Sequence, residues 1–100
     1  MGRRKGEITS AAIDRDFPFQ VALPADKVSG KNLDLIQIVC TALSCAPRNH
    51  SVRREDRDYV IYCFATENDA RGFKAMFGGE DFAPKDRGRG RFWFQWRKTE

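Results

Sequence analysis

The feature that most constrains the fold is a run of six apolar residues at positions 59–64, Tyr-Val-Ile-Tyr-Cys-Phe. The run is rich in the β-branched and aromatic residues that favour strands. Successive side chains of a strand point to opposite faces, so this strand would be apolar on both faces. That pattern is typical of a strand in the centre of a sheet. We therefore expect a sheet built around residues 59–64.

Alternating apolar and polar side chains predict further strands. Residues 17–23 and 91–97 both follow the period of two that a half-buried strand requires. Residues 51–54 are expected to form a short outer strand, joined to the central strand by a turn at residues 55–58. Residues 80–90 have the composition of turns and loops. The sequence thus predicts four strands.

Two helices are expected between these strands. Residues 32–46 place most of their apolar side chains, Leu35 among them, on one half of a helical wheel, and Pro47 follows. The other half carries a single charge, Asp34, and a partner could cover it, although a small uncharged solvent face is the commoner explanation. The second helix begins after Thr66, whose hydroxyl can cap it, and ends at residues 78–79, a glycine pair.

The resulting order is β-α-β-β-α-β. It fits a ferredoxin-like α+β sandwich, in which an antiparallel sheet carries two helices on one face. We expect a flexible N-terminal lead at residues 1–12 and a single α+β domain at residues 13–100. A basic Arg/Gly loop at residues 85–91 would precede the last strand.

The net charge of the 100-residue chain is +4, but its distribution matters more than its size. Residues 1–6 carry three basic side chains, and residues 85–98 carry six basic and one acidic side chain. Residues 7–84 carry nine basic and twelve acidic side chains. The body of the domain is therefore slightly acidic, which leaves only the two ends as candidates for nucleic-acid binding.

The chain shows no signs of secretion, membrane insertion or metal binding. No apolar stretch follows the first charges, and no apolar run approaches the roughly 20 residues that span a bilayer. The thiols of Cys40, Cys45 and Cys63, with His50 as the only histidine, lack the paired spacing of a zinc site. We therefore expect a cytoplasmic protein with reduced thiols that serve as small apolar side chains, no cofactor and no metal.

No catalytic constellation is visible in the sequence. His50 is the only imidazole, and a single histidine near a strand start is usually a surface residue. Cys63 has no basic neighbour that would lower its pKa, so a passive thiol is expected. The sequence therefore favours a protein that is not an enzyme.

The predicted order of elements is shared by RNA-recognition motifs, and residues 57–64 resemble the third strand of that family. The match lies at Arg57, Tyr59 and Phe64, and it places Tyr59 on the open sheet face. Ile61 stands where a second base-stacking aromatic belongs, and Gln20 takes the place of an aromatic on the first strand. These departures indicate shared strand chemistry rather than kinship.

Two functions can be carried forward. The first is a non-catalytic binding module that self-associates as a homodimer, or binds an unidentified protein, through the sheet face left open by the helices. The positions expected on that face are Gln20, Ala22, Ser51, Arg53, Tyr59, Ile61, Cys63, Trp93 and Gln95.

The alternative function is single-stranded nucleic-acid binding by the basic, aromatic C-terminal segment. It would use Arg87, Arg89 and Arg91 with Trp93 and Tyr59. Charges that protect an edge strand from aggregation explain the same segment more simply.

Overall fold

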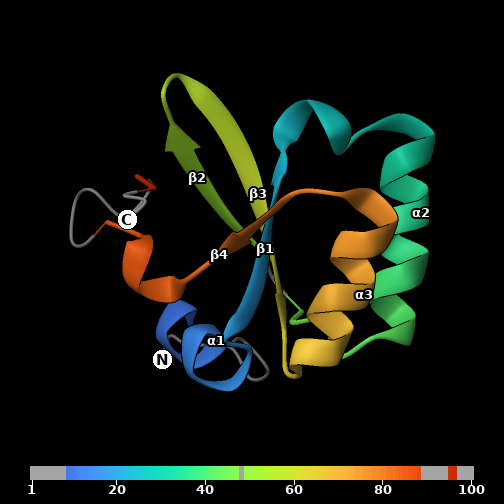
Figure 1. Ribbon diagram of the computed structural model, residues 1–100, viewed down its shortest axis with the longest axis horizontal. Helices are drawn as coiled ribbons and strands as arrows, with labels where there is room; N and C mark the ends of the chain where they lie inside the picture. Colours follow the sequence, from blue (N-terminus) through green and yellow to red (C-terminus); the bar gives the residue numbers. More distant parts are fainter. Residues whose placement is uncertain (1–8, 48, 89–94, 97–100) are drawn as a thin grey trace, which may run out of the picture.

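The computed structural model of the protein describes residues 9–47, 49–88 and 95–96. These residues form a small α+β arrangement in which an open, antiparallel, four-stranded sheet has the order β2-β3-β1-β4 (Figure 1). Three helices accompany the sheet. In chain order the elements are α1 (Ser10–Asp16), β1 (Phe19–Pro24), the 3-10 turn η1 (Ala25–Lys27), α2 (Gly30–Ala42), β2 (His50–Arg54), β3 (Arg57–Phe64), α3 (Glu67–Phe77), β4 (Glu80–Phe82) and the 3-10 turn η2 (Pro84–Asp86).

The expected central strand is confirmed. β3 pairs with β1 on one side, where Tyr62 lies opposite Val21, and with β2 on the other, where Tyr59 lies opposite Val52. The strand is hydrogen-bonded on both edges, and its side chains are buried on both faces. A charged side chain would therefore be costly there, and the sequence carries none from Tyr59 to Phe64.

The β2–β3 hairpin is also confirmed, but its turn is tighter than predicted. Arg54 pairs with Arg57, so the turn consists of Glu55 and Asp56 alone, at φ values of 53° and 63°. Two consecutive positive φ values are what a two-residue type I′ turn requires. The register places Arg53 opposite Asp58, and it therefore lies on the face opposite Tyr59. The prediction that these two side chains share a face is wrong.

Helix α3 lies where the sequence predicted it, between the capping residue Thr66 and the glycine pair. The hydroxyl of Thr66 accepts a hydrogen bond of 3.2 Å from the amide of Asp69, and Gly78 closes the helix at a φ of 80°. Helix α2, in contrast, ends at Ala42, four residues before the predicted end. The reason is a β-bridge between Cys45 and Phe64, with the amide of Ala46 donating to the carbonyl of Cys63 at 2.8 Å. A backbone committed to this bridge cannot continue the helix.

The last strand of the sheet lies where a loop was predicted. β4 consists of three residues that pair with β1, too short for alternation to be visible in the sequence. It is preceded by Gly79 at a φ of 100°, where a Cβ atom would come within 2.6 Å of the carbonyl oxygen of Ala22. Most of the predicted strand at residues 91–97 lies outside the described residues. Within it, Gln95 and Trp96 form isolated bridges to Arg53 and Arg87.

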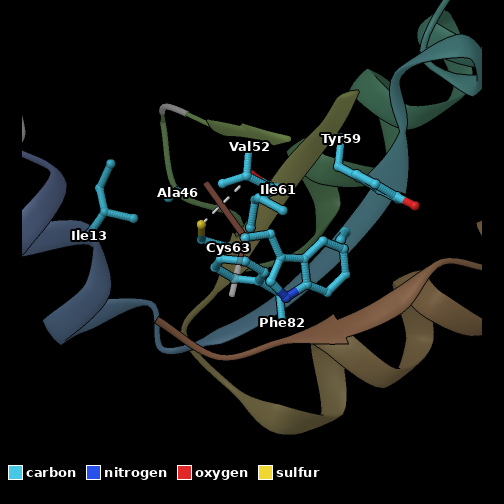
Figure 2. Close-up of a cluster of buried hydrophobic side chains, with 9 residues drawn as sticks. Ile13, Ala46, Val52, Tyr59, Ile61, Cys63 and Phe82 are labelled. Atoms are coloured by element: carbon cyan, nitrogen blue, oxygen red, sulfur yellow. Dashed lines mark hydrogen bonds between the residues drawn. The ribbon is translucent and has the colours of Figure 1, made fainter. Parts of the chain in front are cut away.

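Helices lie on both sides of the sheet, with α2 and α3 on one side and α1 on the other (Figure 1). On one face, α2 and α3 pack on β1 and β3 around the fully buried Phe64 and Phe73. On the other, Ile13 of α1 and Trp96 join a second cluster around Ile61 (Figure 2). The expectation that the helices leave one face open is therefore wrong. The sequence gives little sign of α1 because a seven-residue helix, in which Ile13 is fully buried, is too short to show a period.

Candidate functional site

The predicted contact face is buried rather than exposed. The exposed fractions are 3% for Gln20, 5% for Tyr59 and 0% for Ile61 and Cys63, and Ala22 is also buried. The predicted exposure of these residues is wrong. Of the other predicted members, Ser51 and Arg53 are exposed on the opposite face, Gln95 is half-buried, and Trp93 lies outside the described residues.

Trp96 is the main cover of this face near β4. Its ring meets Tyr59 edge-on at 5.0 Å between centroids, and Phe82 at 5.3 Å. The guanidinium of Arg54 stacks on the indole at 4.0 Å and donates to Glu80 at 2.9 Å. Arg54 and Glu80 belong to the two opposite edge strands, so their ion pair crosses the sheet beside the Trp96 ring. The bond to Glu80 raises the pKa of Arg54.

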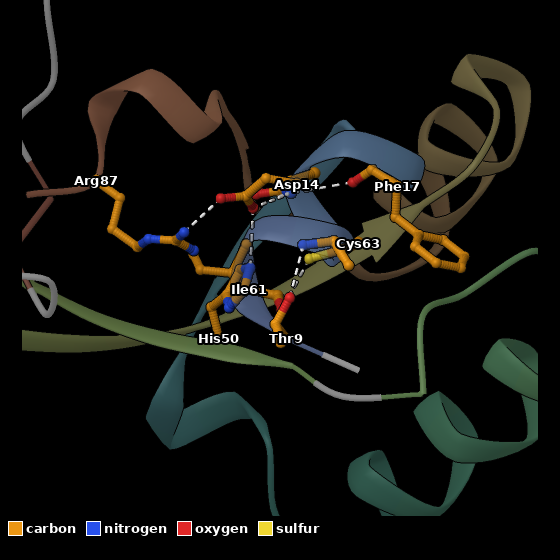
Figure 3. Close-up of polar contacts among 9 residues, drawn as sticks. Thr9, Asp14, Phe17, His50, Ile61, Cys63 and Arg87 are labelled. Atoms are coloured by element: carbon orange, nitrogen blue, oxygen red, sulfur yellow. Dashed lines mark hydrogen bonds and ion pairs between the residues drawn. The ribbon is translucent and has the colours of Figure 1, made fainter. Parts of the chain in front are cut away.

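A second group of polar side chains fastens α1 to the sheet (Figure 3). Oδ1 of Asp14 accepts from Nε2 of Gln20 at 3.1 Å and lies 3.0 Å from Nε2 of His50, while Oδ2 accepts from Arg87. The side chains of Asp14, His50 and Arg87 are 19%, 6% and 14% exposed. We call these four residues the Asp14 clamp.

The Asp14 clamp was not visible in the sequence. Its members come from α1, β1, β2 and the segment after η2, and Asp14 and Arg87 are 73 positions apart. No local pattern brings such residues together. His50, expected at the surface, is buried, and Arg87, expected to contact nucleic acid, is bound to Asp14.

One thiol shares the sheet face with the Asp14 clamp. Cys63 lies on the same sheet face and is fully buried. Burial, with a further contribution from the charge of Asp14, raises the pKa of the Cys63 thiol to about 12. A thiol that stays protonated at neutral pH is a poor nucleophile. Within the described ranges, no three His, Cys, Asp or Glu side chains gather as metal ligands.

The arginines of the described residues are paired with acids. Each of the six lies within 3.9 Å of a carboxylate oxygen: Arg15 with Asp16, Arg53 with Asp58, Arg54 with Glu80, Arg57 with Asp26, Arg71 with Glu67, and Arg87 with Asp14. Binding of phosphates would compete with these pairs. Arg89 and Arg91, the other predicted nucleic-acid contacts, lie outside the described residues.

The outer face of α2 is apolar and exposed. Leu35 is 54% and Ile38 is 66% exposed, one helical turn apart. A shallow hollow of about 370 Å³ beside Ile38 is lined by Asp34, Gln37 and Thr41 as well. The Thr41 hydroxyl donates to the Gln37 carbonyl at 2.9 Å, so its hydrogen is not available to solvent or to a ligand. Asp34, the one charge expected on this face, lines the hollow, whereas Leu35 was predicted to lie in the buried half of the helix.

A wider groove of about 490 Å³ lies at the hairpin, lined by Ala25, Ser51, Val52, Arg53, Asp58, Tyr59 and Val60. Its two charged residues, Arg53 and Asp58, neutralise each other at 2.9 Å. Ligand sites usually combine an apolar lining with convergent polar groups that are free to bind. With its charges already paired, the groove gives weaker support for a contact site than α2 does.

No helix in the described part of the chain has the length and apolar character needed to cross a membrane. Comparisons with protein-family models, with curated proteins and with solved structures find no match to this chain.

Proposed function

We propose that the protein is a non-catalytic binding module that self-associates through the outer face of α2. The observation that carries this proposal is the exposure of Leu35 and Ile38, at 54% and 66%, on adjacent turns of one helix. Isolated exposed apolar residues are ordinary, but neighbouring ones on a surface with little charge are typical of contact sites. The contact surface thus moves from the sheet face to a helix.

The charges of α2 favour a second copy as the partner. A twofold contact brings the same surface of both copies together, so a surface rich in one charge would repel itself. Along its 13 residues α2 carries only Lys31 and Asp34, which are of opposite sign and lie in its first half. An antiparallel crossing near Ile38 would keep these charges away from their counterparts. The outer face of α2 is therefore compatible with pairing to itself.

The size of the contact surface on α2 limits the affinity expected for the dimer. A stable interface buries about 800 Å² on each partner, which two side chains and their neighbours on one helix do not supply. We therefore expect a weak dimer, with a Kd of roughly 10 μM to 1 mM. Such a dimer would be sensitive to local concentration.

Light scattering from micromolar to near-millimolar protein tests the proposal. The wild-type mass should rise with concentration, and Ile38→Lys should stay monomeric because it places a charge in the contact. Met76→Lys is the matched control, since Met76 is 59% exposed but lies on α3. It should behave like the wild type. A wild type that is strictly monomeric across this range would overturn the proposal.

We also infer a ferredoxin-like arrangement for the sheet and its two larger helices. Its support is the succession β1-α2-β2-β3-α3-β4, with β1 and β3 adjacent in the centre of the sheet. In this interpretation α1 and Trp96 are additions that cover the face opposite α2 and α3. An experimental structure with Glu80–Phe82 displaced from the edge of β1 would contradict it.

A further inference from the structure

Most of the exposed residues of α2 lie in a single stripe along the helix. They follow one another at spacings of three and four, which places them on one side of the helix and suits a seam between two helices. The stripe consists of Lys31, Asp34, Leu35, Ile38, Thr41 and Ala42. Its two charges lie near the start of the helix, and its C-terminal half is uncharged.

Lys31 lies at the end of α2 where a positive charge is least favourable. Ser29 is the N-cap, so Lys31 is the second residue of the helix, and the first turn contains no acid. The amides of a first turn carry a partial positive charge, which repels a cation. No ion pair among the described residues involves Lys31, and its side chain is exposed. In a single copy of the chain, this charge therefore weakens the helix slightly.

The C-terminal end of α2 is negative. The amide of Ser44, which a longer helix would donate to the carbonyl of Cys40, donates to the carboxylate of Asp69 at 2.9 Å. The amide of Ala46, which would reach the carbonyl of Ala42, donates to strand β3 instead. Hydrogen bonds from the hydroxyl and the amide of Ser44 lower the pKa of Asp69, so its carboxylate is ionised at neutral pH. The last turn contains no basic residue, so α2 itself supplies no cation to this end.

An antiparallel crossing of two copies brings these two ends of α2 together. If the twofold axis passes Ile38, each residue lies opposite the residue that is equally far beyond Ile38 in the other copy, and Leu35 faces Thr41. Lys31 is seven residues, or about 10 Å, from Ile38 along the helix. It then lies opposite the segment just past Ala42, the last residue of α2 in the other copy. A parallel crossing would instead set Lys31 against its own counterpart.

We propose that two copies pair through antiparallel α2 helices, with Lys31 of each copy bound to the negative C-terminal end of α2 in the other. This proposal rests on the self-association proposed above and assigns its orientation and the residue that selects it. Asp34 lies one turn closer to the crossing, opposite Ala42, so Lys31 is the charge that reaches the helix end. The two charged ends that are unfavourable or unused in one copy are complementary in the pair.

Substitution of Lys31 in the full chain tests the proposal, with the Kd of the dimer measured by sedimentation equilibrium. Lys31→Glu should raise the Kd about tenfold, because it turns two equivalent attractive contacts into repulsive ones. Lys31→Arg keeps the charge and should leave the Kd within about twofold of the wild type. The matched control is Lys85→Glu, which makes the same change of charge in η2, at the opposite end of the molecule from α2 (Figure 1). It should behave like the wild type.

Two further measurements separate orientation from folding. In dilute protein, Lys31→Glu should raise the urea midpoint of unfolding, because an acid in the first turn stabilises a helix. A variant that stabilises the single copy while weakening the pair is not a misfolded one. In a mixture of isotope-labelled and unlabelled wild type, filtered NOEs should connect the methyl groups of Leu35 in one copy with that of Thr41 in the other.

The outcomes distinguish this proposal from the proposed function. If the wild type associates but Lys31→Glu weakens it no more than Lys85→Glu does, the role of Lys31 is overturned and self-association through α2 stands. Intermolecular NOEs between Leu35 and Leu35, which a parallel pair would give, overturn the antiparallel orientation. If the wild type stays monomeric at every concentration, both proposals fail.

Discussion

The sheet face around Ile61 and the outer face of α2 are both apolar, but the chain covers only the first of them. Ile61 is fully buried because Ile13, Trp96 and Phe82 lie in the same cluster. Ile38, in contrast, is 66% exposed. The covering groups come from sequence positions far from β3. Whether an apolar strand or helix becomes a contact surface therefore depends on segments that are remote in the chain.

The helix α1, which covers part of the sheet face around Ile61, is held in place by tertiary contacts. A seven-residue helix is too short to be stable alone, so α1 must draw its stability from Ile13 and the Asp14 clamp. Full burial of an isoleucine contributes about 1.5–3 kcal/mol. Nothing comparable in the described residues lies over the outer face of α2. The two surfaces should therefore respond to substitution in opposite ways.

Replacing Trp96 by alanine should have the largest effect on the free energy of unfolding. Removal of the ring leaves a cavity between Tyr59 and Phe82 and deprives Arg54 of its stacking partner. We expect a loss of about 3–5 kcal/mol, measured by urea unfolding followed by circular dichroism. Leu35→Ala is the matched apolar control and should cost far less. A loss below about 1 kcal/mol would show that Trp96 does not close this face.

Ile13→Ala should come next, with a loss of about 2–4 kcal/mol. The weakened contact should also let α1 detach from the sheet more often, since Ile13 is its fully buried side chain. Labelling of Cys63 in the native protein by a thiol reagent should then accelerate. If Ile13→Ala shows the expected loss of stability but Cys63 is labelled at the wild-type rate, Ile13 does not control the access of the reagent to Cys63.

Asp14→Asn should cost about 2 kcal/mol, because it removes the charge that faces Arg87 and leaves the guanidinium without its partner. The matched control is Asp16→Asn, whose carboxylate pairs with Arg15 at the surface. That exposed pair should contribute little. Equal effects of the two substitutions in urea unfolding would contradict the role of the Asp14 clamp.

Alkaline pH should weaken the fold through Cys63. Its pKa is raised from 9.0 to about 12 in the folded protein, chiefly by burial. A raised pKa means that the unfolded chain loses its proton first, so stability is complete below pH 9.0 and falls as the pH rises towards 12. The contribution is at most about 1.4 kcal/mol per pH unit. Cys63→Ala should flatten the decline in unfolding free energy between these limits, and an unchanged slope would contradict the assignment.

The elements that depend on neighbouring residues could be predicted from the sequence, and those that depend on distant contacts could not. The run before Ala65 identified the central strand, and the cap at Thr66 with the turn at Gly78 identified α3. β4 was missed because three residues show no period, and its place depends on pairing with β1.

The same distinction between local signals and distant contacts applies to the candidate contact surface on α2. The low charge of α2 was visible in its composition, but the exposure of Leu35 was not, because it depends on where Ile36 packs against the sheet. The burial of Tyr59 depends on Trp96, which lies 37 positions further along the chain. Only the folded arrangement could show that the predicted contact face is occupied.

A substitution on α2 should have the smallest effect on stability. Ile38→Lys changes a side chain that is already 66% exposed, so the unfolding free energy should stay within about 0.5 kcal/mol of the wild type. Urea unfolding of dilute protein, in which dimer is absent, is the appropriate measurement. A loss above about 1 kcal/mol would indicate that Ile38 supports the monomer itself.

A dilution series followed by amide NMR tests the central claim most directly, because it reports both apolar surfaces in one sample. On dilution from near-millimolar to micromolar protein, the amide signals of residues 34–41 on α2 should shift, and those of residues 59–63 on β3 should stay in place. Shifts confined to residues 59–63, or no shifts at all, would contradict the account.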